Sequence, residues 1–83
     1  MATTYILFSK MIDRYYIGST EQSMEERLKK HLTNHSGFTG RAKDWEVVHI
    51  QLFETKSEAY ALERKLKALK SRKALENYIK DQA

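Results

Sequence analysis

Two tyrosines and a glycine are the first residues in this chain whose types and spacing can do chemistry. The stretches TTYILF, from residue 3, and YYIGST, from residue 15, are rich in β-branched and aromatic residues, which favour strands. Side chains alternate along a strand, so Tyr5 and Tyr16 can project to the same side if the strands pair in register. Gly18 would lie beside Tyr16 and leave room for a substrate to approach the backbone. The alternative is that both tyrosines only pack the hairpin.

Arg27 and His31 form a second arrangement. They lie four residues apart in a segment with helical periodicity, so they share one helix face at the border of an apolar stripe. The guanidinium of Arg27 offers a planar fork for phosphate oxygens. The imidazole of His31 can hold or move a proton near neutral pH. The alternative is a surface pair without a function.

Glu63 is a third candidate, because its place in a helical pattern between Ala59 and Leu66 predicts a half-exposed side chain. One carboxylate at the border of a core can hold Mg²⁺, which keeps most of its waters and also binds substrate phosphate. The alternative is an ordinary ion pair with Lys67 at the next helical turn.

A zinc site is a weaker hypothesis. His31 and His35 have the four-residue spacing that suits zinc on a helix, and His49 is a possible third ligand. The chain has no cysteine, and no glutamate lies between the two histidines as in the metalloprotease helix motif. These absences argue against zinc.

The elements that must position these residues follow from hydrophobic periodicity. Strands are predicted at 4–8 and 15–18, joined by a loop of several residues. Ser23 and Glu26 have capping-box spacing and open a helix. The buried stripe of that helix consists of Met24, Leu28 and Leu32.

The second half of the chain predicts a strand and two helices. The segment WEVVHIQLFE, from residue 45, is apolar on both faces, so we expect a central strand covered on both sides. Thr55 or Ser57 opens the next helix, and a short third helix follows from Ser71. The stripe of the longer helix contains Ala59, Leu62, Leu66 and Leu69, and that of the last helix Leu75, Tyr78 and Ile79. The predicted fold class is α+β, with a small three-stranded antiparallel sheet flanked by about three helices.

Composition bounds the class of protein. The 83 residues form one domain, 1–83, with a net charge of +4 and no cysteine. Nine of the fifteen cations fall within residues 27–35 and 64–73, which favours a polyanion partner. The sequence shows no membrane-spanning stretch and no signal peptide, so we expect a cytoplasmic protein without a membrane partner.

Together these arrangements resemble the GIY-YIG nuclease domain over roughly residues 3–75, and the basic one-domain form is most similar to the small standalone bacterial members. The matching stretches are TTY, YIG, RLKKH, DWEVV and SEAYALERKLK, in that order. The first motif half is reduced from GIY to TTY, so only its tyrosine survives. Asn77 is in the region where many members carry an asparagine, but no motif anchors it, and no role is carried over.

The resemblance implies four catalytic residues. Tyr5 and Tyr16 match the tyrosines of the two motif halves, one of which acts as the base for an attacking water. Arg27 matches the arginine that neutralises charge on the phosphate. His31 matches the polar residue one turn later that helps to activate a tyrosine or water.

The resemblance also implies a metal and substrate contacts. Glu63 matches the single metal-binding carboxylate, with Mg²⁺ or Mn²⁺ as cofactor. Gly18, Lys30 and Lys67 are expected to bind substrate. The implied function is a metal-dependent DNA endonuclease that selects structure over base sequence, as in DNA repair, with a possible protein partner for targeting. The alternative is a nucleic-acid-binding module of the same fold with weak or no cleavage.

Overall fold

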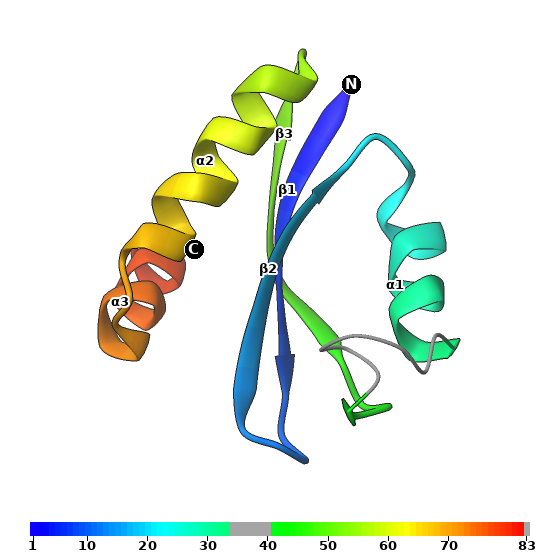
Figure 1. Cartoon of the computed structure of the whole chain (residues 1–83), viewed down its shortest axis with the longest axis vertical. Helices are drawn as coiled ribbons and strands as arrows, with labels where there is room; N and C mark the ends of the chain where they lie inside the picture. Colours follow the sequence, from blue (N-terminus) through cyan, green and yellow to red (C-terminus); the bar gives the residue numbers. More distant parts are fainter. Residues whose placement is uncertain (34–40, 83) are drawn as a thin grey trace.

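The computed structural model describes residues 1–33 and 41–82 and has the predicted order of elements. The elements are β1 (Ala2–Ser9), β2 (Arg14–Thr20), α1 (Met24–Thr33), β3 (Glu46–Phe53), α2 (Lys56–Ala68) and α3 (Arg72–Gln82). The strands form one antiparallel sheet, with α1 on one face and α2 and α3 on the other (Figure 1). This architecture confirms the predicted α+β class.

The sheet has the order β2-β1-β3, which corrects one prediction. The strand from Glu46 to Phe53 is an edge strand, whereas the apolar residues on both its faces predicted a central one. Its Ile50 and Leu52 are 48 % and 61 % exposed. The central strand is β1, which is hydrogen-bonded on both sides and buried along almost its whole length. Apolar residues on both faces therefore did not distinguish a covered strand from an exposed one.

Each face of the sheet carries its own hydrophobic cluster. Under α1, Tyr5, Leu7 and Trp45 are buried, and the predicted stripe of α1 packs against them. Under α2 and α3, Ile6 meets Leu66 and Leu75. Because Tyr5 and Ile6 are adjacent in β1 and point to opposite faces, this one strand contributes to both clusters.

The helix boundaries follow local hydrogen-bonding rules. The Ser23 hydroxyl accepts the Glu26 amide hydrogen bond at 3.2 Å, and Thr55 with Glu58 forms a complete capping box at the start of α2. At the other end of α2 the predicted stripe runs one residue too far, because Leu69 is 37 % exposed and the helix ends at Ala68. Each helix in the described ranges is too short or too polar to cross a bilayer.

Thr4 connects the central strand to α2 through a buried hydrogen bond. Its hydroxyl donates to the Ala59 carbonyl over 2.7 Å, and the Thr4 side chain has no exposed surface. A hydroxyl at this position can be buried at low cost only because this acceptor faces it. The reduced motif half TTY thus has a structural reason for its second threonine.

We expect Thr4→Val to lower the free energy of unfolding by about 1 kcal/mol, because the isosteric methyl group keeps the packing but loses this bond. Urea denaturation of the purified variant measures the loss. Thr3→Val is the matched control, since Thr3 is also buried but its hydroxyl makes no such bond to α2. Equal losses in both variants would contradict the role given to the Thr4 bond.

Candidate active site

The phenol of Tyr5 is the centre of the site. Its oxygen lies 2.8 Å from His31 Nε2 and accepts a hydrogen bond from Arg27 Nε at 3.1 Å. Both partners project from the same face of α1, as their four-residue spacing predicted. Tyr5 itself is in the middle of β1 and has no exposed surface. A buried phenol is therefore held between a cation and an imidazole.

Burial and charge fix the protonation of this group. Burial, with the Arg27 charge, lowers the pKa of His31 from 6.5 to about 4, so the imidazole is neutral at neutral pH. A neutral imidazole with its hydrogen on Nδ1 can accept the phenolic hydrogen at Nε2. Burial also raises the pKa of Tyr5, although the hydrogen bond from Arg27 acts against that rise. The resting phenol is thus protonated, with an acceptor beside it.

Tyr16 lies on the same sheet face as Tyr5, as predicted. The register pairs Tyr5 with Gly18 and Leu7 with Tyr16, so all four point toward α1. The Tyr16 ring is 6.4 Å from the Tyr5 ring and meets the His31 ring edge-on at 5.0 Å. Tyr16 is half-buried, and its phenol also interacts with Arg27. Tyr16 is therefore the more accessible of the two phenols.

Gly18 has a different role on this face from the one predicted. A Cβ atom at this position would lie 2.5 Å from the Tyr5 hydroxyl oxygen and 3.1 Å from the Tyr16 ring. The space beside the glycine is thus filled by the two tyrosines, whereas we expected it to admit a substrate. Gly18 is needed because the Tyr5 phenol lies directly against the backbone of β2.

Glu63 approaches the site from the other face of the sheet. It is on α2, its side chain is 15 % exposed, and it forms the predicted ion pair with Lys67 at 2.7 Å. Its other oxygen accepts a 2.5 Å hydrogen bond from Ser19, which follows Gly18 in β2 and points to the α2 face. The charge of Glu63 is close enough to raise the Tyr5 pKa. The site therefore wraps around the edge strand β2.

Ser19 is a site residue that the sequence analysis missed. Strand alternation places it on the opposite face from Tyr16 and Gly18, which is the face that α2 covers. That signal was present in the stretch YIGS, but nothing in the sequence showed that α2 would place a carboxylate there.

The remaining predicted residues lie around this centre. Lys67 contacts Glu63, whereas Lys30 is exposed on α1 and its ammonium bonds the Gln22 side chain at 3.2 Å. The zinc hypothesis is wrong for His31 with His49, because His49 pairs with Ile6 and contacts Tyr78 on the other face of the sheet. His35 is outside the described residues.

The donor set suits a hard divalent cation with few protein ligands. Glu63 supplies a single carboxylate beside the hydroxyl of Ser19, and no trio of acidic, histidine or cysteine side chains gathers there or anywhere else within 1–33 and 41–82. Mg²⁺ is commonly held by one or two carboxylates, with water and substrate phosphate completing its shell. The metal-binding role of Glu63 stays a prediction, and in this structure its two oxygens are bonded to Ser19 and Lys67.

The fold is of the nuclease type, as comparison with protein families shows. The family model described as the GIY-YIG catalytic domain matches residues 1–78, so the chain belongs to the GIY-YIG family. Comparison with curated proteins and with solved structures finds no significant match.

The depressed pKa of His31 predicts a pH-dependent stability. The unfolded chain binds a proton on this imidazole near pH 6.5 and the folded chain only near pH 4. As the pH falls from 6.5 to 4, the free energy of unfolding should therefore decrease by up to about 3 kcal/mol. The measurement is urea denaturation between pH 7 and pH 4.5. His31→Gln should flatten this part of the profile, and an unchanged slope in that variant would contradict the assignment.

Gly18→Ala should lower the free energy of unfolding by about 1–3 kcal/mol, because the added methyl group displaces the Tyr5 phenol. Repeating the substitution in a Tyr5→Leu background removes the atoms that the methyl group meets. The cost should then shrink, and a double-mutant cycle by urea denaturation measures the coupling. Additive effects would show that Gly18 is needed for some other reason.

Proposed function

We propose that this protein is a divalent-metal-dependent endonuclease that hydrolyses phosphodiester bonds in DNA. The observation that carries the proposal is the Tyr5 phenol held between the guanidinium of Arg27 and the neutral imidazole of His31. Hydrolysis needs a base for the attacking water, positive charge around phosphorus and a stabilised leaving oxygen. The three side chains address the first two needs.

Tyr5 acts as a proton relay in this proposal. Its raised pKa argues against a standing phenolate at neutral pH. The phenol oxygen takes a proton from the attacking water while its own hydrogen passes to His31 Nε2. The water oxygen bonds to phosphorus, the bond to the leaving sugar oxygen breaks, and that oxygen takes a proton from solvent. His31 suits this step because its lowered pKa keeps the imidazole neutral before the reaction, and in this proposal its hydrogen is on Nδ1.

Arg27 both covers the phenol and recognises the phosphate. It is partly exposed and lies against the Tyr5 oxygen. A guanidinium that turns toward the non-bridging oxygens of a phosphate would hold them and uncover the phenol. Tyr16, half-buried beside them, orients the attacking water or the phosphate with its hydroxyl.

Glu63 would hold Mg²⁺ or Mn²⁺ with water and substrate phosphate as the other ligands. A cation bound there would supply Lewis-acid stabilisation of the leaving oxygen. Ser19 fixes one carboxylate oxygen, and Lys67 balances the charge of the other.

The substrate preference follows from contacts to phosphates. Lys30 and Lys67 are exposed cations near the site and suit the DNA backbone, so recognition of DNA structure rather than base sequence is expected. Branched or flapped DNA, as handled in repair, fits such a site, and a partner protein could supply targeting.

The second candidate is a nucleic-acid-binding module that cleaves poorly or not at all. The observation in its favour is that Tyr5 is fully covered and its pKa is raised rather than lowered. Glu63 does not decide between the two candidates, because its carboxylate is already paired with the ammonium group of Lys67 at 2.7 Å.

The deciding experiment incubates purified protein with branched, nicked and single-stranded DNA in Mg²⁺ or Mn²⁺ and in chelator. We expect metal-dependent cleavage that falls by at least about 100-fold in Arg27→Lys, which keeps the charge but removes the planar fork for phosphate oxygens, and in Glu63→Gln, which removes the charge that would hold the cation. Glu54→Gln, an exposed acid on the surface, is the control and should keep full activity. Cleavage that persists in chelator, or in Glu63→Gln, would overturn the metal-dependent mechanism.

A further inference from the structure

A groove beside the candidate active site has no part in the chemistry proposed above. It has a volume of about 570 Å³ and runs along β2 on the face covered by α2 and α3. We call it the β2–α3 groove. The side chains that matter for its chemistry are Arg14, Tyr15, Ile17, Lys67, Lys70 and Leu75. Its size is in the range of sites that bind small organic groups.

The floor of the groove is apolar, and one aromatic ring in it is fixed in place. Ile17 and Leu75 belong to the cluster under α2 and α3. The Tyr15 ring packs 4.7 Å from Phe8, and its hydroxyl donates to Glu76 at 3.0 Å. The guanidinium carbon of Arg72 lies 5.5 Å from the centroid of the same ring. A rigid aromatic face at a polar surface is a suitable platform for a planar ring.

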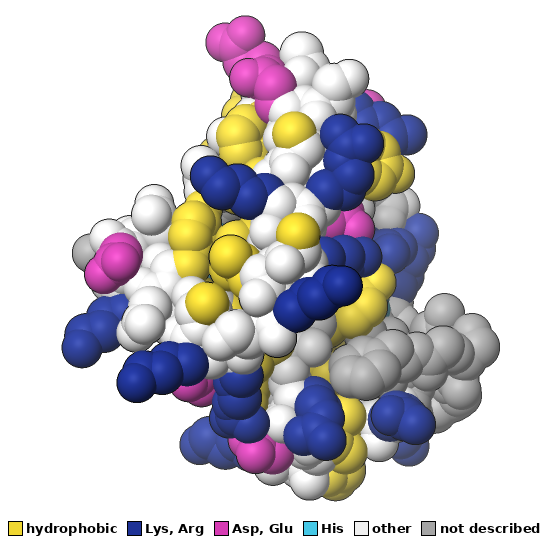
Figure 2. Space-filling model, turned by 60° about the vertical axis from the view of Figure 1, so that its left-hand side comes forward, with side chains coloured by type: hydrophobic (Ala, Val, Ile, Leu, Met, Phe, Trp, Pro, Cys, Tyr) yellow, Lys and Arg dark blue, Asp and Glu magenta, His cyan; other side chains and the backbone are white. Residues whose placement is uncertain are grey.

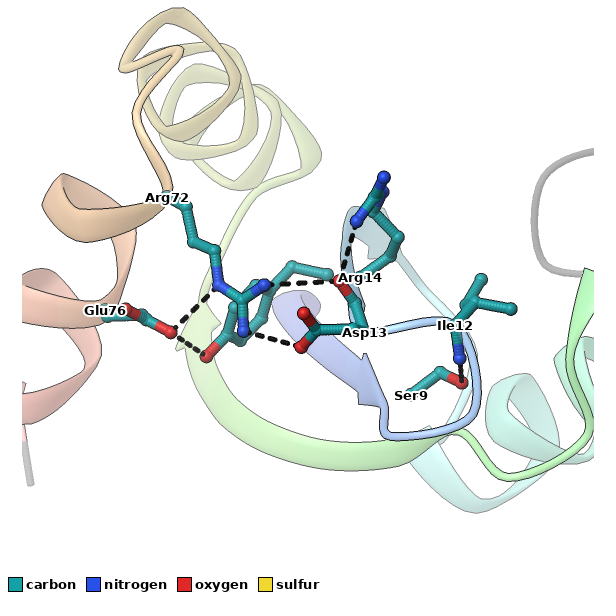
Figure 3. A network of polar contacts seen from close by, with 7 residues as sticks. Ser9, Ile12, Asp13, Arg14, Arg72 and Glu76 are labelled. Carbon is teal, nitrogen blue, oxygen red and sulfur yellow. Dashed lines mark hydrogen bonds and ion pairs between the residues drawn. The ribbon is translucent and has the colours of Figure 1, made fainter.

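Arg72 belongs to the scaffold of this groove, because acids already neutralise its charge. Its guanidinium donates to Asp13 Oδ1 at 2.7 Å and to Glu76 Oε2 at 3.2 Å, joining α3 to the turn between β1 and β2 (Figure 3). Its role is to fix Tyr15 and the turn, so an anionic ligand must be bound by other cations.

Three other cations remain at the rim. Lys70 forms no ion pair in the described part of the chain, Arg14 is beside Asp13 and helps to lower its pKa, and Lys67 pairs with Glu63. In Figure 2, where the side of the molecule that carries α2 faces the viewer, lysine and arginine side chains surround exposed hydrophobic ones. An apolar floor with a cationic rim is complementary to a ligand with a flat ring and a negative charge.

The backbone at Lys70 provides a clean test of its ammonium group. Lys70 directly follows Leu69, the C-cap residue of α2, and has φ 50°, a left-handed conformation in which many helices end and which glycine adopts far more easily. Glycine would ease the turn but would remove the cation from the rim.

We propose that the β2–α3 groove binds an unpaired nucleotide of the substrate strand, next to the phosphate that is cut. Lys67 lines the groove and pairs with Glu63 of the candidate active site, so a strand bound in the groove would lie next to that site. The base would lie against Tyr15 and the apolar floor, and the adjoining phosphates against Lys67, Lys70 and Arg14. A base within a duplex is already stacked and cannot enter such a groove. The inference rests on the proposed function for the position of the cut.

The test is equilibrium binding in chelator, so that no cleavage occurs, of a blunt duplex and of duplexes with short unpaired 3′ or 5′ tails. We expect wild-type protein to bind one tailed duplex about fivefold or more tightly than the blunt one. Lys70→Gly should remove most of that preference and reduce the salt dependence by about one phosphate contact. The same variant should unfold at a higher temperature, which separates lost binding from misfolding.

Lys73→Gln is the matched control, because Lys73 is exposed on α3 but does not line the groove. It should keep the preference for the tailed duplex. A 4-thiothymidine in the tail should photocross-link to residues 14–17 or 66–75. Equal binding of blunt and tailed duplexes of both polarities, or cross-links only to α1, would overturn the proposal.

These outcomes are distinct from those of the nuclease test. If cleavage depends on metal and is lost in Glu63→Gln, but the protein shows no preference for tailed duplexes, the nuclease proposal stands and the groove proposal is wrong. If the protein prefers tailed duplexes and Lys70→Gly removes that preference, but the wild type does not cleave DNA, the groove is a nucleic-acid binding site and the nuclease proposal is wrong.

Discussion

The buried hydroxyl of Tyr5 is the constraint on which the rest of the site depends. Tyr5 has no exposed surface, and a buried hydroxyl without partners would lower the free energy of unfolding by about 1–3 kcal/mol. Its partners, Arg27 and His31, come from one turn of α1, so the phenol fixes how that helix lies on the sheet. Gly18 completes the constraint, because the phenol occupies the space where a side chain would be.

Stability and chemistry make opposite demands on this cluster. Burial of His31 lowers its pKa to about 4, which weakens the folded state in acid but keeps the imidazole neutral at neutral pH. Burial also raises the pKa of Tyr5, so in the proposed nuclease the phenol acts as a base only by passing its hydrogen to His31. If Tyr5 and His31 were more exposed, the free energy of unfolding would depend less on pH. The imidazole would then be partly protonated near neutral pH and could not serve only as the acceptor of the phenolic hydrogen.

The sequence predicted residue faces well and sheet order poorly. Strand alternation placed Tyr5 with Tyr16, and helical spacing placed Arg27 with His31, because these relations depend only on local periodicity. The order β2-β1-β3 depends on how the strands pair and on where the helices pack against the sheet. The apolar residues of Glu46–Phe53 did not show whether this strand would be at the centre or at the edge. The role of Gly18 and the bond from Ser19 to Glu63 depend on contacts between distant segments, which no local pattern encodes.

The position of β2 at the edge of the sheet explains how groups on opposite faces can serve one substrate. Tyr5, Arg27 and His31 lie on the α1 face, whereas Glu63 and the β2–α3 groove lie on the other. The central strand β1 is covered on both sides, so the two sets can meet only around β2. In the proposed nuclease, the DNA strand must therefore cross this edge near Gly18 and Ser19. A glycine and a serine are among the smallest residues, and larger side chains at the crossing would separate the cation site from the phenol.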